Sequence, residues 1–143
     1  MGSVAPTPER IAQLAALEGD GPIVMINLLR YRAAADYPVG FDAAPCSGRE
    51  AYQRYGAVAG PLILASGGRP IWIGRVQASA IAPEGEEWDD AILVEYPSRK
   101  AFLEMIGSEA YQASAPHRTA ALDDSRLIVT SPMMDALAAL PDE

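Results

Sequence analysis

Two adjacent residues in the last third of the chain, His117 and Arg118, combine the side chains that proton transfer and anion binding require. Histidine titrates near neutral pH, and arginine can bind a carboxylate through two parallel hydrogen bonds. We therefore consider His117 a candidate catalytic residue and Arg118 a candidate substrate-binding residue. The structural alternatives are a surface histidine and an ion pair between Arg118 and Glu95 or Asp124.

Asn27 is a second candidate for substrate binding, because it interrupts the apolar run Ile23–Tyr31. In a strand it shares a face with Met25 and Leu29. A buried amide is costly unless its hydrogen-bonding groups are paired. Asn27 either orients a ligand or anchors a loop or a dimer seam, and the sequence favours neither.

Aromatic side chains supply a third group of candidates. Tyr55 could move a proton and Trp72 could contact an aromatic substrate, whereas the alternative for both is ordinary core packing. The wider set that could line an aromatic pocket is Tyr52, Tyr55, Trp72, Trp88 and Tyr111.

Arg75 and Glu95 fall on consecutive expected strands and are candidate substrate-binding residues. If the register placed them opposite each other, the ion pair would polarise a cavity, although such a pair stabilises a fold only weakly. A purely structural pair is the alternative.

Few residues here are suited to holding a transition metal. Cys46 is the only cysteine and His117 the only histidine, which excludes an intrachain disulfide and a zinc site built from several thiolates. The acidic residues gather in turn-like stretches such as PEGEEWDD. We predict no metal and no cofactor.

The charge balance is acidic: 11 basic and 19 acidic residues give a formal net charge of −8. This field repels phosphate backbones and anionic membranes, so we expect neither nucleic acid nor a membrane as partner. There is no apolar run of about 18 residues, and the first residues, MGSVAPTPER, do not resemble a signal peptide. We expect a cytoplasmic protein.

The length of 143 residues predicts one domain, residues 1–143, with a core over about residues 22–131. Hydrophobic periodicity and turn residues predict four strands. The expected strands are Ile23–Tyr31, Pro70–Ile81, Ala91–Tyr96 and, after a turn at Asp123 and Asp124, Arg126–Thr130.

Helices are expected between these strands and at both ends of the chain. One begins at Ser47 or Gly48 and should be kinked or split by Pro61, another begins at Ser98, and a third is broken at Pro116. Additional terminal helices are predicted from Pro8 and over Met133–Leu140. The unpatterned stretch Arg32–Ser47 is too long for an ordinary connection, so we expect a lid or a dimer contact there.

The resulting order, β-α-β-β-α-β, predicts an α+β ferredoxin-like domain with a four-stranded antiparallel sheet. Both core helices would cover one sheet face. We expect a second copy of the chain to cover the other face in a homodimer, because an exposed apolar sheet face is an association site.

The run AILVEYPSRKAFLEMIGSEAYQASAPHRTAALDDSRLIV resembles the signature of the domain-of-unknown-function family 1330, within the dimeric α/β-barrel superfamily. The matching positions are Glu95, Tyr96, Pro97, Ser98, Ser108, Tyr111 and Arg118. The first half is similar too, through Asn27, Tyr52, Tyr55 and the glycine pair before Arg69. The resemblance implies a ferredoxin-like protomer whose sheet faces its twin across a barrel. It implies no reaction.

Relatives in that wider superfamily include cofactor-free monooxygenases of aromatic polyketides, lactone isomerases and haem-handling enzymes, and fold does not choose among them. Our leading hypothesis is a metal-free small-molecule enzyme: an oxygenase, isomerase or cyclase acting on an aromatic or polyketide-like acid. The alternative hypothesis is a non-catalytic ligand-binding or assembly module.

Overall fold

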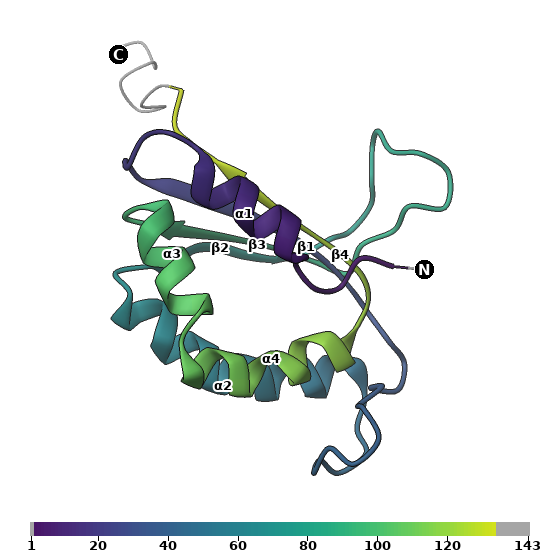
Figure 1. Cartoon of the computed structure of the whole chain (residues 1–143). Coiled ribbons are helices and arrows are strands. Elements are labelled where there is room, and N and C mark those ends of the chain that lie inside the picture. The colour runs from purple at the N-terminus through teal and green to yellow at the C-terminus, as the bar shows by residue number, and fades with distance from the viewer. Residues whose placement is uncertain (1, 134–143) are drawn as a thin grey trace.

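The computed structural model describes residues 2–133. It contains one antiparallel sheet of four strands in the order β2-β3-β1-β4. The strands are β1 (Ile23–Tyr31), β2 (Arg69–Arg75), β3 (Asp90–Tyr96) and β4 (Leu122–Thr130). The helices are α1 (Pro8–Ala16), α2 (Gly48–Ala65), α3 (Arg99–Ile106) and α4 (Glu109–Ala121). In Figure 1, α2 and α4 lie side by side on one side of the sheet.

This arrangement confirms the predicted α+β class and the β-α-β-β-α-β order, with α1 added in front. Thr7 begins α1 by accepting a hydrogen bond from the amide of Arg10, and Pro8 occupies the first turn. The helix predicted over Met133–Leu140 falls outside the described residues, apart from Met133 itself.

The central strand β1 has two different faces. Ile23, Met25, Asn27 and Leu29 are buried, whereas the residues between them are only half-buried. Because side chains alternate along a strand, the buried set points toward the helices. The prediction that Asn27 shares a face with Met25 and Leu29 is confirmed.

Two hydrophobic clusters fill the space between the sheet and the helices. One contains Ile23, Met25, Val94, Tyr96, Phe102 and Met105. The other contains Leu29, Ala51, Ala121 and Leu122. Asn27 stands on β1 between Met25 of the first cluster and Leu29 of the second, so a polar group occupies the middle of an otherwise apolar face.

The start of α2 is fixed by a capping box and by a tight backbone junction. The Ser47 hydroxyl accepts from the Glu50 amide at 3.1 Å, and the Glu50 carboxylate accepts from the Ser47 amide at 3.0 Å. Next to it, the Gly48 amide donates to the Arg32 carbonyl at 3.0 Å. A Cβ atom at Gly48 would overlap the carbonyls of Arg32 and Ala121. The end of β1, the start of α2 and the end of α4 therefore meet here.

The predicted split of α2 at Pro61 and the predicted break at Pro116 are wrong, whereas a kink at Pro61 stays a prediction. The helix α2 is continuous through Pro61, and α4 is continuous through Pro116. A proline frees the carbonyl four residues earlier. In these helices that carbonyl belongs to Ala57 or Gln112, which are both exposed, so water can hydrate it.

Two strand boundaries also differ from the sequence prediction. The strand β2 begins at Arg69 and ends at Arg75, not at Ile81. Residues 77–82 are all exposed, so the alternation of polar and apolar side chains there does not create a buried face. Asp123 and Asp124 belong to β4 and not to a turn. The chain passes directly from α4 into β4 through the fully buried Leu122.

The junction at Gly48 can be tested with a matched pair of glycines in α2. We expect Gly48→Ala to lower the free energy of unfolding by about 1–3 kcal/mol, because the methyl group overlaps two carbonyls. A Cβ at Gly56 would meet nothing within 4 Å, so Gly56→Ala should raise this free energy by about 0.5–1 kcal/mol. Urea unfolding measures both. Equal effects of the two substitutions would contradict the junction.

Candidate functional site

The interior side of α4 carries a buried arginine. Arg118 is only 8% exposed, and its Nη1 donates to the main-chain carbonyl of Val4 at 3.1 Å. Its Nη2 is buried and has no hydrogen-bond partner. Within residues 2–133, no carboxylate lies within 4.0 Å of this side chain. The Tyr52 hydroxyl also lies within hydrogen-bonding reach of the guanidinium. The charge is therefore removed from water with neutral partners only, which is an unfavourable state.

Two tyrosines of α2 lie near this arginine, because its charge acts on the pKa of both Tyr52 and Tyr55. The hydroxyl groups of Tyr55 and Tyr111 are 2.8 Å apart, and the Tyr52 ring lies against the Tyr55 ring with a centroid distance of 5.2 Å. Burial raises the pKa of Tyr55 far above its ordinary value. Burial also raises the pKa of Tyr52, although the positive charge of Arg118 acts in the opposite direction. Tyr52 and Tyr55 are therefore protonated at neutral pH, so they can donate hydrogen bonds.

Asn27 is buried on the helix-facing side of β1. Its Nδ2 donates to the Ile92 carbonyl of β3 at 3.3 Å, a long hydrogen bond. The side chain is 9% exposed. Asn27 of β1, Tyr55 of α2 and Arg118 of α4 are all buried, and the charge of Arg118 acts on the pKa of Tyr55. The one side-chain hydrogen bond of Asn27 within residues 2–133 is the one to Ile92.

A carboxylate fixes the position of α2 over the sheet beside these tyrosines. Asp90 accepts from the Tyr31 hydroxyl at 2.7 Å and from Nη1 of Arg49 at 2.9 Å. The Arg49 guanidinium also covers the Tyr31 ring, 4.5 Å from its centroid. Burial, with a smaller contribution from Asp90, raises the pKa of Tyr31. The Tyr31 ring then meets the edge of Tyr52 at a centroid distance of 5.6 Å.

His117 lies apart from Arg118, in contact with the Arg32–Ser47 segment. Its Nδ1 is 2.6 Å from the Tyr37 hydroxyl, and its ring packs edge-on against Tyr37 and Phe41. Arg54 also donates to the Tyr37 hydroxyl, at 3.3 Å. Burial and the charge of Arg54 lower the pKa of His117. The adjacent residues therefore have different surroundings, and they do not form an acid–base pair on one ligand.

A shallow hollow of about 440 Å³ lies next to His117, between α4 and the Arg32–Ser47 segment. Its lining residues are Asp36, Tyr37, Pro38, Gln112, Ala115, Pro116, Thr119 and Ala120. The amide of Asp36 donates to the Ala120 carbonyl at 2.9 Å, which holds the segment against the end of α4. The Arg32–Ser47 segment therefore packs beside the helix that carries Arg118, and its role as a lid or a dimer contact stays a prediction.

The remaining predicted site residues lie elsewhere. Trp72 is 61% exposed on the edge strand β2, with its indole over Gly74. The expected pair of Arg75 with Glu95 is wrong, because the register places Arg75 opposite Asp90. Arg69 takes its place and binds Glu95 with a distance of 3.1 Å between Nε and Oε1. As ligand-binding residues, Trp72, Arg75 and Glu95 stay predictions.

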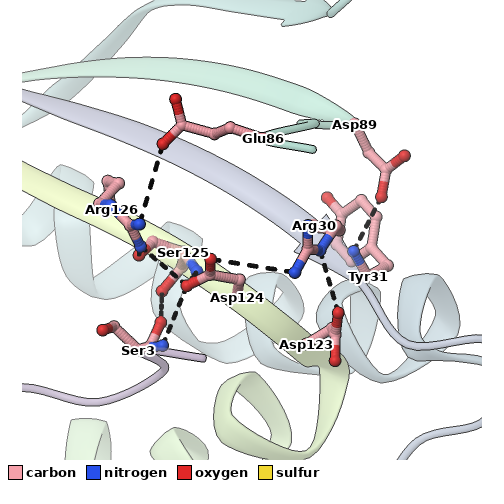
Figure 2. Close-up of polar contacts among 9 residues, drawn as sticks. All are labelled: Ser3, Arg30, Tyr31, Glu86, Asp89, Asp123, Asp124, Ser125 and Arg126. Carbon is pink, nitrogen blue, oxygen red and sulfur yellow. Dashed lines mark hydrogen bonds and ion pairs between the residues drawn. The ribbon is translucent and has the colours of Figure 1, made fainter. Parts of the chain in front are cut away.

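Figure 2 shows a polar network at the end of the sheet where β1 and β4 lie side by side. Arg30 binds Asp123 at 3.0 Å, and Arg126 binds Asp124 at 2.8 Å. Asp124 also accepts from the Ser3 amide at 2.9 Å. Although burial acts to raise it, these hydrogen bonds hold the pKa of Asp124 below its ordinary value. The network ties the amino-terminal residues to β4.

The contacts of Arg118 with Val4 and of His117 with Tyr37 were not predicted from sequence. Both join residues far apart in the chain, and neither Val4 nor Tyr37 stands in a recognisable motif. The only signal was the length of Arg32–Ser47. Within residues 2–133, no group of three or more His, Cys, Asp or Glu side chains is placed to hold a metal ion, and no described helix is long and apolar enough to span a membrane.

The strand order and the helix pair on one sheet face define a ferredoxin-like α+β protein. A dabb family protein with a ferredoxin-like fold from Mesorhizobium loti has the same fold, with a TM-score of 0.51 and 13% identity, covering 80% of this chain and 99% of that chain. The family model described as domain of unknown function (DUF1330) matches residues 45–132, and the chain belongs to this family.

A protein of unknown function from Rhodopseudomonas palustris, RPA0582, is more similar over nearly the whole chain. Its crystal structure aligns with a TM-score of 0.86 and 41% identity, covering 94% of this chain and 100% of that chain. The methylated RPA0582 protein aligns with a TM-score of 0.87 and 41% identity, covering 94% and 98%. No curated protein matches the chain.

The surroundings of His117 predict its titration, and this sole histidine gives one unambiguous NMR signal. We expect its pKa to lie below the ordinary value of about 6.5. Arg54→Gln should raise this pKa, whereas Lys100→Gln, a change on the exposed side of α3, should leave it unchanged. Since the folded state resists protonation, stability should fall as the pH drops through about 6.5. A pKa at or above the ordinary value would contradict the described environment.

Proposed function

We propose that each protomer binds a small aromatic or conjugated carboxylic acid between the sheet and the α2–α4 pair. The observation that carries this proposal is the buried Nη2 of Arg118, which has no partner. A ligand carboxylate would supply the missing negative charge and accept two parallel hydrogen bonds from the guanidinium.

The groups around Arg118 favour a flat acid over a simple anion. The rings of Tyr52 and Tyr55 offer apolar faces. The hydroxyls of Tyr55 and Tyr111 are hydrogen-bonded to each other, which leaves one O–H as a donor to a carbonyl or enol oxygen. Asn27 adds an amide from the sheet. Apolar walls with a few polar groups are typical of small-molecule sites.

As an enzyme, this site would act by orientation and hydrogen bonding. Arg118 would hold the carboxylate, Asn27 would orient the ligand, and Tyr55 would donate to an oxygen on which negative charge develops. An isomerase or cyclase on an aromatic or polyketide-like acid would use these groups directly. An oxygenase would use the same binding groups.

A non-catalytic ligand-binding module is the second candidate, and one observation favours it. Burial raises the pKa values of Tyr52 and Tyr55, so neither phenol is a base at neutral pH. His117 has a lowered pKa but lies beside Tyr37, apart from Arg118. Turnover would therefore need a base supplied by the ligand or by movement of the Arg32–Ser47 segment.

The carboxylate requirement can be tested with benzoate and its neutral analogue benzamide. We expect benzoate to bind the wild-type protein at least about tenfold more tightly than benzamide, because only benzoate compensates the Arg118 charge. Arg118→Gln should remove this preference, and Arg10→Gln, a change on the exposed helix α1, should retain it. Isothermal titration calorimetry measures the affinities. Equal binding of the two probes, or benzoate binding that survives Arg118→Gln, would overturn the proposal.

We also propose that the chain is a homodimer through the sheet face opposite the helices. The register places Trp72, Leu93, Ile26 and Ile128 in one row across all four strands. Trp72 is 61% exposed and Ile128 is 47% exposed. A row of apolar side chains across a sheet can pack against its own copy about a two-fold axis.

Neighbouring residues on β4 provide a matched test of this dimer. Ile128 pairs with Ile26 on the open face, whereas Leu127 pairs with Asn27 on the helix-facing side, and the two are similarly exposed. We expect size-exclusion chromatography with light scattering to report a dimer for the wild type and for Leu127→Glu, and a monomer for Ile128→Glu. A monomeric wild-type protein at micromolar concentration would rule out this interface.

A further inference from the structure

The amino-terminal arm, residues 2–4, is held on the protein body by three hydrogen bonds that use only its main chain. The Ser3 amide donates to Oδ1 of Asp124 at 2.9 Å, and the Ser125 hydroxyl donates to the Ser3 carbonyl at 2.6 Å. The third bond runs from Nη1 of Arg118 to the Val4 carbonyl at 3.1 Å. Figure 2 shows Ser3 beside Asp124 and Ser125 on β4.

The arm covers the site as well as contacting it. The half-buried Val4 side chain packs against the cluster of Leu29, Ala51, Ala121 and Leu122, and Tyr52 packs against the same cluster. Arg118 acts on Tyr52 electrostatically, so the guanidinium, Val4 and Tyr52 occupy one neighbourhood. Residues 2 and 3 themselves are exposed.

We propose that this arm is a displaceable strap over the Arg118 site: the Val4 carbonyl occupies Nη1 in the free protein, and a ligand carboxylate takes its place and binds Nη1 and Nη2 together. This inference rests on the proposed function, because it assumes that Arg118 receives a carboxylate. It adds a regulation of that site, since access to the guanidinium depends on the position of residues 2–4.

In this exchange a ligand carboxylate, a strong hydrogen-bond acceptor, replaces the neutral Val4 carbonyl on Arg118. A neutral carbonyl leaves Nη2 unsatisfied, whereas a carboxylate satisfies both nitrogens and their charge. The released arm gives up the packing of Val4 on its hydrophobic cluster, whereas its polar groups at Ser3 lie at an exposed position where water can replace Asp124 and Ser125. The closed strap lowers the apparent affinity for the ligand by the fraction of protein in which it is open.

Two substitutions loosen the strap without touching Arg118, Asn27 or the tyrosines. Ser125→Ala removes the hydroxyl that binds the Ser3 carbonyl. Gly2→Val forces a shift of the arm, because a Cβ at residue 2 would overlap the Asp123 carbonyl. Ser3→Ala is the matched control, since the arm's hydrogen bonds at this residue use only its main chain.

Phenylglyoxal, which modifies exposed arginines, measures the cover over Arg118 without any ligand. We expect mass spectrometry to show modification of Arg118 at least about fivefold faster in Ser125→Ala and in Gly2→Val than in the wild type. The Ser3→Ala protein should react at the wild-type rate. Equal rates in all four proteins would overturn the strap, whatever their ligand binding.

Benzoate affinity then tests the displacement. We expect the two loosened variants to bind benzoate about three- to tenfold more tightly than the wild type, with Ser3→Ala unchanged. If the wild type binds benzoate through Arg118 and loosening has no effect, the displacement is wrong while the proposed function stands. If none of the proteins binds benzoate although the labelling rates differ, the proposed function and the displacement both fail and the arm is only a cover.

Discussion

The guanidinium of Arg118 lies out of water, and the groups around a charge in that position must compensate it. In this fold, the compensation comes from a main-chain carbonyl of residue 4, at the opposite end of the sequence, and one nitrogen is left without a partner. Tyr52 and Tyr55, which burial keeps protonated, lie near the charge. The amino-terminal arm, α2 and α4 therefore all contribute groups near the Arg118 guanidinium. The proposed ligand would supply the hydrogen-bond acceptor that Nη2 lacks.

Much of the fold could be predicted from sequence, because β1 and β3 carry strong local patterns. The alternation around Asn27 correctly assigned it to the face of Met25 and Leu29. The predictions of where helices and strands are interrupted were less successful. The prolines predicted a kink or split in α2 and a break in α4, yet both helices continue through them, and the carbonyls that the prolines leave unbonded belong to exposed residues. The acidic pair after α4 looked like a turn, but its charges are bound by Arg30 and Arg126, so the strand accommodates it.

The candidate site was less predictable, because it depends on contacts between distant parts of the chain. His117 and Arg118 are adjacent in sequence but point in different directions, because consecutive residues of a helix are rotated by about 100° around its axis. The residues that face each other on β2 and β3 are set by the first residue of β2. Because β2 starts at Arg69, the register places Arg69 opposite Glu95 and Arg75 opposite Asp90, which the sequence had left open. Val4 carries no motif, so its carbonyl on Arg118 could be found only in the structure.

The most direct test of the account is a crystal structure of the protein grown with 4-bromobenzoate, in which anomalous scattering locates the bromine. The account predicts a bromine peak between the sheet and the α2–α4 pair, with the carboxylate on Nη1 and Nη2 of Arg118 and the Val4 carbonyl moved away. A structure in which Val4 still accepts from Arg118 and the bromine lies outside that space would contradict the claim that this guanidinium is a carboxylate-binding group.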